Sequence, residues 1–267
     1  MQVEAGGTVR WASDQLTAEE PLEIRVNGIS ISVTMRTPGS DFDLAAGFLV
    51  TEGLIAGADE IVSMRMCPAA SAPDGALNVV DIVLRGDTVQ PAAVRNFYMT
   101  SSCGICGKAS IDAVRTRSQY YVSDDPLRVD AALLASLPDA LRGAQHEFAR
   151  TGGLHAAGLF DEHGAVVCVR EDVGRHNAFD KVIGWAATQH RLPLRSHIIL
   201  ASGRASFELT QKALMAGLPM LAAVSAPSDL AVALANESGM TLAGFVRGDR
   251  LNVYCGQQRL TRSPVTP

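Results

Sequence analysis

Two cysteines with the spacing C-x-x-C, Cys103 and Cys106, are the residues of this chain best suited to chemistry. They lie in SSCGICGK, a stretch of small residues that ends in Lys108. A thiolate is both a nucleophile and a metal ligand, and a nearby lysine or the start of a helix favours the anion. The pair could therefore hold a metal ion, cycle as a disulfide, or carry a group on sulfur.

These three uses leave different marks on a sequence. A structural zinc site needs four ligands, and the chain has one C-x-x-C pair. We expect Cys67, Cys168 and Cys255 to be small buried residues, although a site in which Cys67 joins the pair stays open. A thioredoxin-like disulfide would follow a strand and a large aromatic residue, whereas a polar SSC approach suits an accessible thiolate. We favour Cys103 as a sulfur carrier that Cys106 resolves as a disulfide, keep a thiol–disulfide oxidoreductase as an alternative, and expect no bound metal.

The whole chain limits the classes of protein to which this pair can belong. It has 267 residues, 47% hydrophobic and 19% charged, which is typical of an ordinary α/β protein with one large or two modest domains. The net charge is −5, from 23 basic and 28 acidic residues, so we expect no nucleic-acid partner. We find no secretion or transit signal and no apolar run of about 18 residues, so we expect a cytoplasmic protein with reduced thiols and no membrane partner.

The first part of the chain, residues 1–126, is predicted to be a mixed α+β domain that ends in the C-x-x-C loop. LEIRV-NG-ISISV predicts a β-hairpin, because apolar residues alternate and Asn27 and Gly28 can adopt the positive φ angles of a two-residue turn. Helical spacing in DFDLAAGFLV predicts a helix that Ser40 or Asp41 caps. IVSMRM and VVDIVL predict further strands. The turn-rich stretch YYVSDDP marks the domain boundary.

The second part, residues 127–267, alternates strands and helices. The predicted strands are LHAAGLF, AVVCVRE, HIILA, MLAAV, TLAGFV and LNVYC, and the predicted helices are VDAALLASL, NAFDKVIGWAATQ, SFELTQKALMAG and SDLAVALANESG. In the second helix, Phe179, Val182, Ile183 and Ala186 form an apolar stripe. This alternation indicates a largely parallel sheet with helices on both faces. The order of elements is similar to that of a zinc nucleoside deaminase whose glutamate and zinc cysteines are missing, so we predict a cytidine-deaminase-like α/β/α sandwich without a zinc site.

Three arginine-bearing turns of the second domain could hold phosphate groups. The residues are Ser202, Gly203 and Arg204 in one turn, Arg175 and His176 in a second, and Arg247 and Arg250 in a third. The first two turns each open a helix, where unpaired NH groups and a bidentate guanidinium suit a phosphate. Both follow the carboxyl ends of strands, the edge at which open α/β sheets bind ligands. Whether the turns converge, or their side chains are solvated or only cap and pack, stays open at this point.

Five motifs in this order, SSCGICGK, TGGLHAA, REDVGRHNAFDK, SGRASFELTQKA and GFVRGDRLNVY, resemble those of FdhD, the family of formate dehydrogenase accessory sulfurtransferases. The resemblance extends from the predicted hairpin to the last strand, with no departure inside the motifs. It implies the deaminase-like sandwich with an added domain, a homodimer and a cytoplasmic location. It further implies a persulfide sulfurtransferase that takes sulfur from a cysteine desulfurase and delivers it to the molybdenum cofactor needed by formate dehydrogenase.

The resemblance also implies roles for particular positions. Cys103 would carry the persulfide, with Cys106 as its partner, and molybdenum bis(molybdopterin guanine dinucleotide) would be bound as a substrate that guanosine diphosphate mimics. The stretch expected to bind it consists of Phe245, Val246, Arg247, Gly248, Asp249 and Arg250. A non-catalytic chaperone for the cofactor is the main alternative. The sequence leaves open which formate dehydrogenase is served, whether the C-x-x-C loop is ordered, whether sulfur passes within or between subunits, and whether Cys106 is indispensable.

Overall fold

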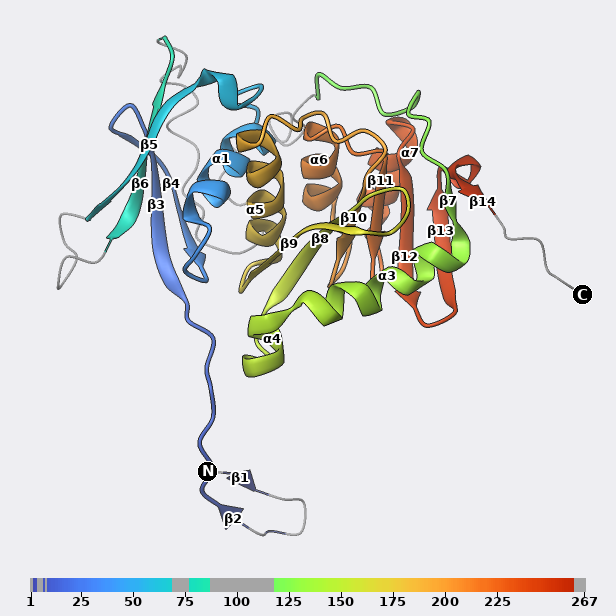
Figure 1. Ribbon diagram of the computed structural model, residues 1–267, viewed down its shortest axis with the longest axis horizontal. Helices are drawn as coiled ribbons and strands as arrows, with labels where there is room; N and C mark the ends of the chain where they lie inside the picture. The colour runs from blue at the N-terminus through green and yellow to red at the C-terminus, as the bar shows by residue number, and fades with distance from the viewer. Residues whose placement is uncertain (1, 4–6, 8, 69–76, 87–117, 262–267) are drawn as a thin grey trace, which may run out of the picture.

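The computed structural model describes residues 2–3, 7, 9–68, 77–86 and 118–261. Cys103, Cys106 and the rest of the predicted C-x-x-C loop lie outside these residues. The described chain forms a mixed α/β fold with a four-stranded and a six-stranded sheet (Figure 1). A row of helices lies beside the larger sheet, and the helix Asp41–Thr51 lies next to the smaller sheet (Figure 1).

The smaller sheet has the strand order β4-β3-β6-β5. Its strands are β3 (Glu20–Val26), β4 (Ile29–Arg36), β5 (Ile61–Pro68) and β6 (Leu77–Leu84), and a separate pair is formed by β1 (Gln2–Val3) and β2 (Val9–Arg10). The predicted hairpin is confirmed, because β3 and β4 are antiparallel and Asn27 (φ 50°) and Gly28 (φ 77°) make the turn. The apolar side chains of β3, Leu22, Ile24 and Val26, are buried in the core.

Helix α1 (Asp41–Thr51) follows this hairpin and differs from the prediction at its start. Ser40 stands at the N-cap position, but its backbone is left-handed (φ 53°) and its side chain makes no capping hydrogen bond. Asp41 does not cap the helix either; it accepts hydrogen bonds of 2.9 and 3.3 Å from the buried guanidinium of Arg36 on β4. The predicted side-chain cap is therefore wrong, and an ion pair with β4 holds this helix end instead.

The larger sheet has the order β13-β12-β11-β10-β8-β9. Its strands are β8 (His155–Phe160), β9 (Val166–Asp172), β10 (Ile198–Ala201), β11 (Met220–Ala223), β12 (Thr241–Arg247) and β13 (Arg250–Cys255). All six predicted strands are confirmed, but the largely parallel arrangement is wrong. Strand β8 is antiparallel to both neighbours and β13 is antiparallel to β12. Short hairpin turns join β8 to β9 and β12 to β13, and such turns force antiparallel pairing.

Helices cover both faces of the larger sheet, as predicted. The helices of this half are α3 (Ala131–Ala144), α4 (His146–Thr151), α5 (Arg175–Thr188), α6 (Phe207–Met215) and α7 (Asp229–Glu237). The described residues also form the short strands β7 (Val129–Asp130) and β14 (Leu260–Thr261) and the 3-10 helices η1 (Ala58–Glu60) and η4 (Gln257–Arg259). In β10, Ile199 and Ala201 pack in the core with α5, α6 and α7, whereas Ile198 and Leu200 pack in the core with α3. The particular likeness to nucleoside deaminases stays a prediction.

Helices α1 and α5 cross at very close range, so the two sheets share one core. A Cβ atom on Gly47 would lie 1.9 Å from the backbone oxygen of Asp180, and one on Gly184 would lie 1.8 Å from that of Asp43. Only glycine permits this approach. Helix α5 is consequently buried on most of its surface, and not only along the predicted stripe. This core contains residues from both sides of the predicted domain boundary at residue 126. The division into two domains stays a prediction.

Candidate functional site

The predicted phosphate-binding turns lie at one edge of the larger sheet. Strands β9, β10, β11 and β12 run in the same direction, because β9 and β10 are each antiparallel to β8 while β11 and β12 are parallel to β10. The turns that follow β9, β10 and β12 therefore lie at the carboxyl edge, where open α/β sheets hold ligands. His155 lies at the same edge, because it is the first residue of β8, which runs the opposite way.

The turn between β9 and α5 presents one charged donor and buries one histidine. The N-cap of α5 is Gly174, and no side chain caps this helix end. The Nε atom of Arg175 is buried without a hydrogen-bond partner among the described residues, so it is a charged donor suited to an anion. His176 is buried, with its Nε2 3.5 Å from Oγ of Ser206 and 4.0 Å from Oε2 of Glu208. It thus connects the first turns of α5 and α6.

The turn between β10 and α6 lies directly against β8. The Oγ of Ser202 accepts a 2.8 Å hydrogen bond from the backbone NH of Ala156, and the NH of Ser202 donates to the carbonyl of Ala156 at 3.0 Å. A Cβ on Gly203 would lie 3.5 Å from Nδ1 of His155, so the imidazole faces this glycine. Arg204 is exposed. The structure therefore brings this turn, His155 and the turn with Arg175 together.

His155 was not among the predicted site residues. Its side chain is half-buried. Burial lowers the pKa of His155 below its usual value and the nearby charge of Arg175 lowers it further, while Asp172 acts in the opposite direction. The imidazole is consequently neutral at pH 7, with one donor and one acceptor nitrogen. The motif TGGLHAA predicted only a strand, and its pairing between β9 and β10 is what places His155 between the two turns.

The stretch from Phe245 to Arg250 forms the end of β12 and its turn into β13. Phe245 has a left-handed backbone (φ 53°) at a register shift, a strained conformation that is common at functional sites. Its NH donates to the carbonyl of Ser225 at 3.2 Å, and the NH of Ser225 donates to the carbonyl of Gly203 at 3.1 Å. Backbone hydrogen bonds therefore link this strand to the turn after β10.

The side chains of the same stretch divide into buried and exposed ones. Val246 is buried in the core on the α3 side, so only its backbone can contact a ligand. Four residues of the turn are exposed, namely Arg247, Gly248, Asp249 and Arg250. Within the described part of the chain, no hydrogen bond or ion pair joins the side chains of Arg247 or Arg250 to the other two turns, so their role as ligand contacts stays a prediction.

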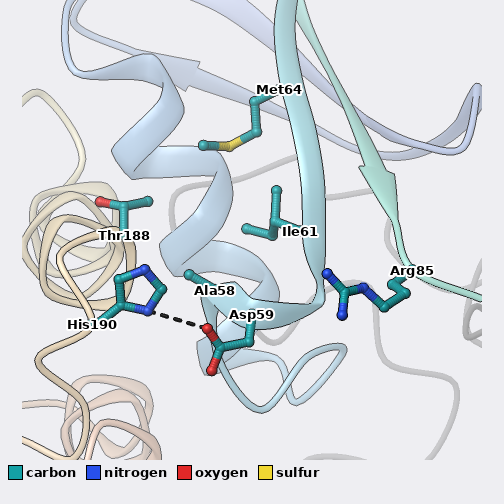
Figure 2. Close-up of a pocket in the computed structure, with 7 residues that line it drawn as sticks. All are labelled: Ala58, Asp59, Ile61, Met64, Arg85, Thr188 and His190. Atoms are coloured by element: carbon teal, nitrogen blue, oxygen red, sulfur yellow. Dashed lines mark ion pairs between the residues drawn. The ribbon is translucent and has the colours of Figure 1, made fainter.

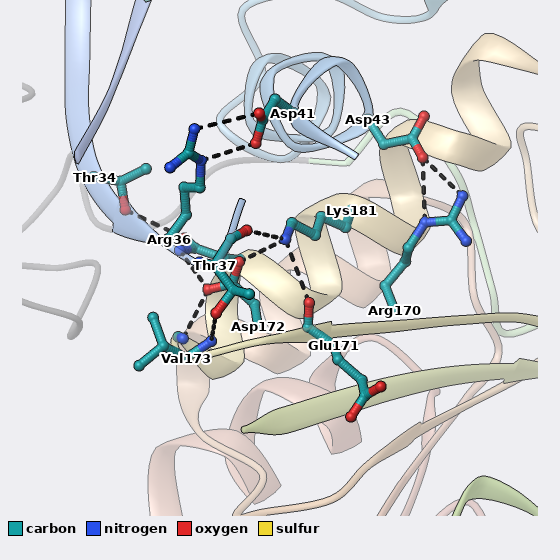
Figure 3. A network of polar contacts seen from close by, with 12 residues as sticks. Thr34, Arg36, Thr37, Asp41, Asp43, Arg170, Glu171, Asp172, Val173 and Lys181 are labelled. Atoms are coloured by element: carbon teal, nitrogen blue, oxygen red, sulfur yellow. Dashed lines mark hydrogen bonds and ion pairs between the residues drawn. The ribbon is translucent and has the colours of Figure 1, made fainter. Parts of the chain in front are cut away.

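A buried polar network fastens the smaller sheet to this ligand edge (Figure 3). Asp172, at the end of β9, is fully buried and its Oδ2 lies 2.7 Å from Nζ of Lys181. The same carboxylate accepts hydrogen bonds from the NH groups of Thr37 at 3.1 Å and Gly174 at 2.8 Å. Lys181 also donates to the carbonyl of Thr37 at 2.8 Å. The end of β4 is thereby held against the turn that carries Arg175.

Three cysteines lie among the described residues, and two of them are poor nucleophiles. Cys168 and Cys255 are buried, as predicted, whereas Cys67 is half-buried on β5. Burial raises the pKa of Cys168 to about 11 and also raises the pKa of Cys255. Within residues 9–68, 77–86 and 118–261, no three His, Cys, Asp or Glu side chains gather as a metal site. That part of the chain also has no helix long and apolar enough to span a membrane.

A cavity of about 560 Å³ lies at the other end of α5, away from the turns. Figure 2 shows its lining residues, which are Ala58, Asp59, Ile61, Met64, Arg85, Thr188 and His190. On its rim, Oδ1 of Asp59 lies 3.2 Å from Nδ1 of His190, and both side chains are largely exposed. Arg85 donates its NH to Glu60, and Ser118 donates its hydroxyl to the carbonyl of Leu214 at the end of α6. The described residues that flank the segment 87–117 therefore lie at this opposite end of the helices.

Similar proteins identify the family of this chain. The profile of the FdhD/NarQ family matches residues 17–261. The chain belongs to the FdhD/NarQ family. A sulfur carrier protein FdhD of Streptomyces avermitilis is 58% identical over 259 residues, which cover 95% of this chain and 92% of that protein. One of Mycolicibacterium paratuberculosis is 57% identical over 251 residues, 92% of each chain.

The fold of the family is also found in a solved structure. The crystal structure of a candidate formate dehydrogenase accessory protein of Desulfotalea psychrophila matches this chain with a TM-score of 0.72 and 24% identity. The match covers 97% of this chain and 96% of the other. The resemblance inferred from five ordered motifs is therefore confirmed at the level of the family and its mixed α/β fold.

Proposed function

We propose that this protein carries sulfur as a persulfide on Cys103 and delivers it to the bis-guanine-dinucleotide form of the molybdenum cofactor for formate dehydrogenase. The observation that carries the proposal is the meeting of Arg175, His155 and the Gly203 turn at one sheet edge, in a chain whose relatives are named sulfur carrier proteins. The names of the relatives support the sulfur chemistry. The groups at the sheet edge support binding of an acceptor that bears phosphate groups.

The groups at this edge suit the pyrophosphates of a guanine dinucleotide. Such a ligand needs NH donors and cations, and Arg175 has a buried Nε without a partner among the described residues. The first turn of α5 has no side-chain cap, so its NH groups are not used by one. Gly203 has no side chain to obstruct a ligand that approaches His155. The exposed Arg247 and Arg250 could extend the grip along the sheet edge.

The sulfur step follows from thiol chemistry. The thiolate of Cys103 attacks the outer sulfur of a donor persulfide on a cysteine desulfurase, and the donor cysteine leaves as its thiolate. When the outer sulfur later leaves Cys103 as sulfide, the thiolate of Cys106 can form a disulfide with Cys103. A thiol reductant must then restore the pair. Cys168 and Cys255 are unsuited to this role because both are buried with raised pKa values.

The positions of the flanking residues are compatible with transfer to the sheet edge. Helix α5 has 14 residues and therefore separates its two ends by about 21 Å. Cys103 is 17 peptide units from Gly86 and 15 from Ser118, and the shorter connection limits its reach to at most about 54 Å. We further propose a cysteine desulfurase and formate dehydrogenase as partners, a homodimer as the assembly and the cytoplasm, where thiols stay reduced, as the location.

The first test is loading of the carrier. Incubation with a cysteine desulfurase and cysteine should add one sulfur atom to the peptide that contains Cys103, and a reductant should remove it. The variant Cys103→Ala should accept no sulfur, whereas the matched control Cys255→Ala should load normally. Peptide mass spectrometry measures both. A Cys103→Ala protein that loads like the wild type would refute the assignment.

The second test concerns the acceptor. Guanosine diphosphate should bind to the wild-type protein, and Arg175→Ala should weaken it by about tenfold or more, the effect of losing one charged hydrogen bond. Arg150→Ala, an exposed arginine on α4, serves as the control and should not change the affinity. Isothermal calorimetry gives the dissociation constants. An unchanged affinity of the Arg175 variant would show that this side chain does not bind the phosphates, and Arg204→Ala and Arg247→Ala test those two side chains in the same way.

A chaperone that binds the cofactor without carrying sulfur is the second candidate. Its support is that the described binding groups all belong to the sheet edge and none of them is a reactive thiol. The two functions differ in one experiment. If the double variant Cys103→Ala, Cys106→Ala activates formate dehydrogenase as well as the wild type does, the protein acts as a chaperone and not as a sulfur carrier.

A further inference from the structure

His155 lies between the two turns that carry Arg175 and Gly203. It is the first residue of β8, with Asp172 of β9 as its neighbour across one strand pair. On the other side its Nδ1 would lie 3.5 Å and its Cε1 3.6 Å from a Cβ on Gly203. Residue 203 needs no left-handed backbone, so the absence of a side chain there leaves space over the ring rather than relieving strain.

The charged groups around His155 come from two neighbouring elements. Arg175, at the start of α5, places a positive charge near the ring, and Asp172, at the end of β9, places a negative charge that Lys181 already balances. The turn after β10 contributes Gly203, which has no charge, and its own charged side chain, Arg204, is exposed. Burial and Arg175 both disfavour the imidazolium, so the free protein holds a neutral ring beside Arg175, whose Nε has no hydrogen-bond partner among the described residues.

We propose that His155 binds a phosphate group of a nucleoside diphosphate between Arg175 and the Gly203 turn, and that the ring gains a proton when this phosphate arrives. The proposal rests on the proposed function and deepens it by assigning a phosphate contact to β8. An arriving phosphate offsets the charge of Arg175 and adds negative charge next to the ring, and both changes favour the imidazolium. The proton comes from the solvent, and the charged ring then donates to a phosphate oxygen.

The sign of the pH dependence follows from this argument. The imidazole pKa of the free protein lies below its usual value, and the phosphate raises that pKa in the complex. Between these two pKa values binding takes up a proton, so the contribution of His155 to affinity grows as the pH falls through this window. The phosphate itself titrates at about pH 6, which opposes the trend, so the wild type must be compared with a variant that lacks the imidazole.

The experiment is calorimetry of guanosine diphosphate binding to the full chain, from pH 6 to pH 8, in two buffers with different ionisation enthalpies. At pH 6, His155→Gln should bind about tenfold more weakly than the wild type, and the difference should shrink toward pH 8. The wild type should take up more protons on binding than the variant does, by up to one proton per site. The exposed His163, on the turn between β8 and β9, provides the matched control, because His163→Gln should change neither quantity.

A second variant tests the geometry without removing the imidazole. In Gly203→Ala the new methyl group would meet the ring of His155 at 3.5 Å, an ordinary contact, so the fold should tolerate it and the melting temperature should stay unchanged. The methyl group fills the space over the ring, so the affinity for guanosine diphosphate should fall about tenfold or more.

The outcomes separate this proposal from the proposed function. Equal affinity and equal proton uptake in the wild type and His155→Gln would overturn the role of His155, while the Arg175 and Cys103 experiments would still stand. If Gly203→Ala binds guanosine diphosphate like the wild type, the space over the ring is not a phosphate site. If the wild type does not bind guanosine diphosphate at all, both the proposed nucleotide binding at the sheet edge and the role of His155 are refuted. Sulfur loading on Cys103 is a separate test and does not depend on this result.

Discussion

Replacing Lys181 by methionine should destabilise the protein strongly, because it leaves a buried carboxylate without its cation. Lys181 has 2% of its side chain exposed and Asp172 has none, and their charged atoms are 2.7 Å apart. Methionine keeps most of the volume of the side chain but removes the ion pair and the hydrogen bond to Thr37. Removing one partner of a buried pair costs about 3–5 kcal/mol of the free energy of unfolding.

The geometry places the expected cost near the lower end of this range. Asp172 keeps three donors in the variant, namely the NH groups of Thr37 and Gly174 and the side-chain amide of Asn177. These donors continue to stabilise the carboxylate, so we expect a loss of about 3 kcal/mol. Because the pair also holds the turn that carries Arg175, the affinity for guanosine diphosphate should fall in Lys181→Met as well.

The assay is urea unfolding followed by circular dichroism for Lys181→Met, Asp172→Asn and the double variant. The double variant should be more stable than the sum of the single losses predicts, with a coupling energy of at least about 2 kcal/mol. Arg150→Met serves as the control, because its ion pair with Glu147 is exposed and should contribute less than about 1 kcal/mol. Single losses that add within about 0.5 kcal/mol would refute the reasoning, as would a loss no larger than that of the control.

Two further predictions concern close packing and thiol reactivity. Gly184→Ala should destabilise the protein by at least about 3 kcal/mol, because its methyl group would lie 1.8 Å from a backbone oxygen of α1. The control Gly143→Ala on α3 meets no atom within 4 Å and should be neutral or stabilising by up to about 1 kcal/mol. Thermal unfolding of both variants measures the difference, and equal effects would show that α1 and α5 do not touch at Gly184. At pH 8, Cys168 of the folded protein should react with iodoacetamide at least roughly a hundredfold more slowly than in urea, because its raised pKa of about 11 keeps the thiol protonated until the pH rises through that value. Peptide mass spectrometry over time measures this, and equal rates would contradict the burial of the thiol.

Local sequence patterns were sufficient to predict the elements of this fold but not their packing. The Asn27-Gly28 turn and the strands and helices of the second half follow from residue periodicity and turn chemistry, which act over a few neighbours. The direction of β8 and β13 depends on connection length and on strand partners far along the chain. The burial of α5 on most sides depends on α1, which crosses it at Gly47 and Gly184 and lies more than a hundred residues away. Such contacts have no periodic signature.

The candidate site shows the same division. Arg175 and the residues 202–204 were predicted from glycine-rich turns that open helices, and the structure brings both turns to one edge. His155 was not predicted as a site residue, because its position depends on strand pairing. The ion pair of Asp172 and Lys181 was not predicted either, because the two residues are nine positions apart and only the start of α5 brings them together. Cys103 and Cys106 lie outside the described residues, so their role stays a prediction.

Transfer of sulfur from Cys103 to the cofactor is the most direct test of the account. The protein is loaded with radiolabelled sulfur by a cysteine desulfurase, freed of donor, and mixed with a formate dehydrogenase whose molybdenum cofactor lacks sulfur. We predict that the label leaves Cys103 and appears with the cofactor of the enzyme as formate oxidation appears, and that Cys103→Ala supports neither event. Full activation of the enzyme while the label stays on Cys103, or full activation by the Cys103→Ala protein, would contradict it.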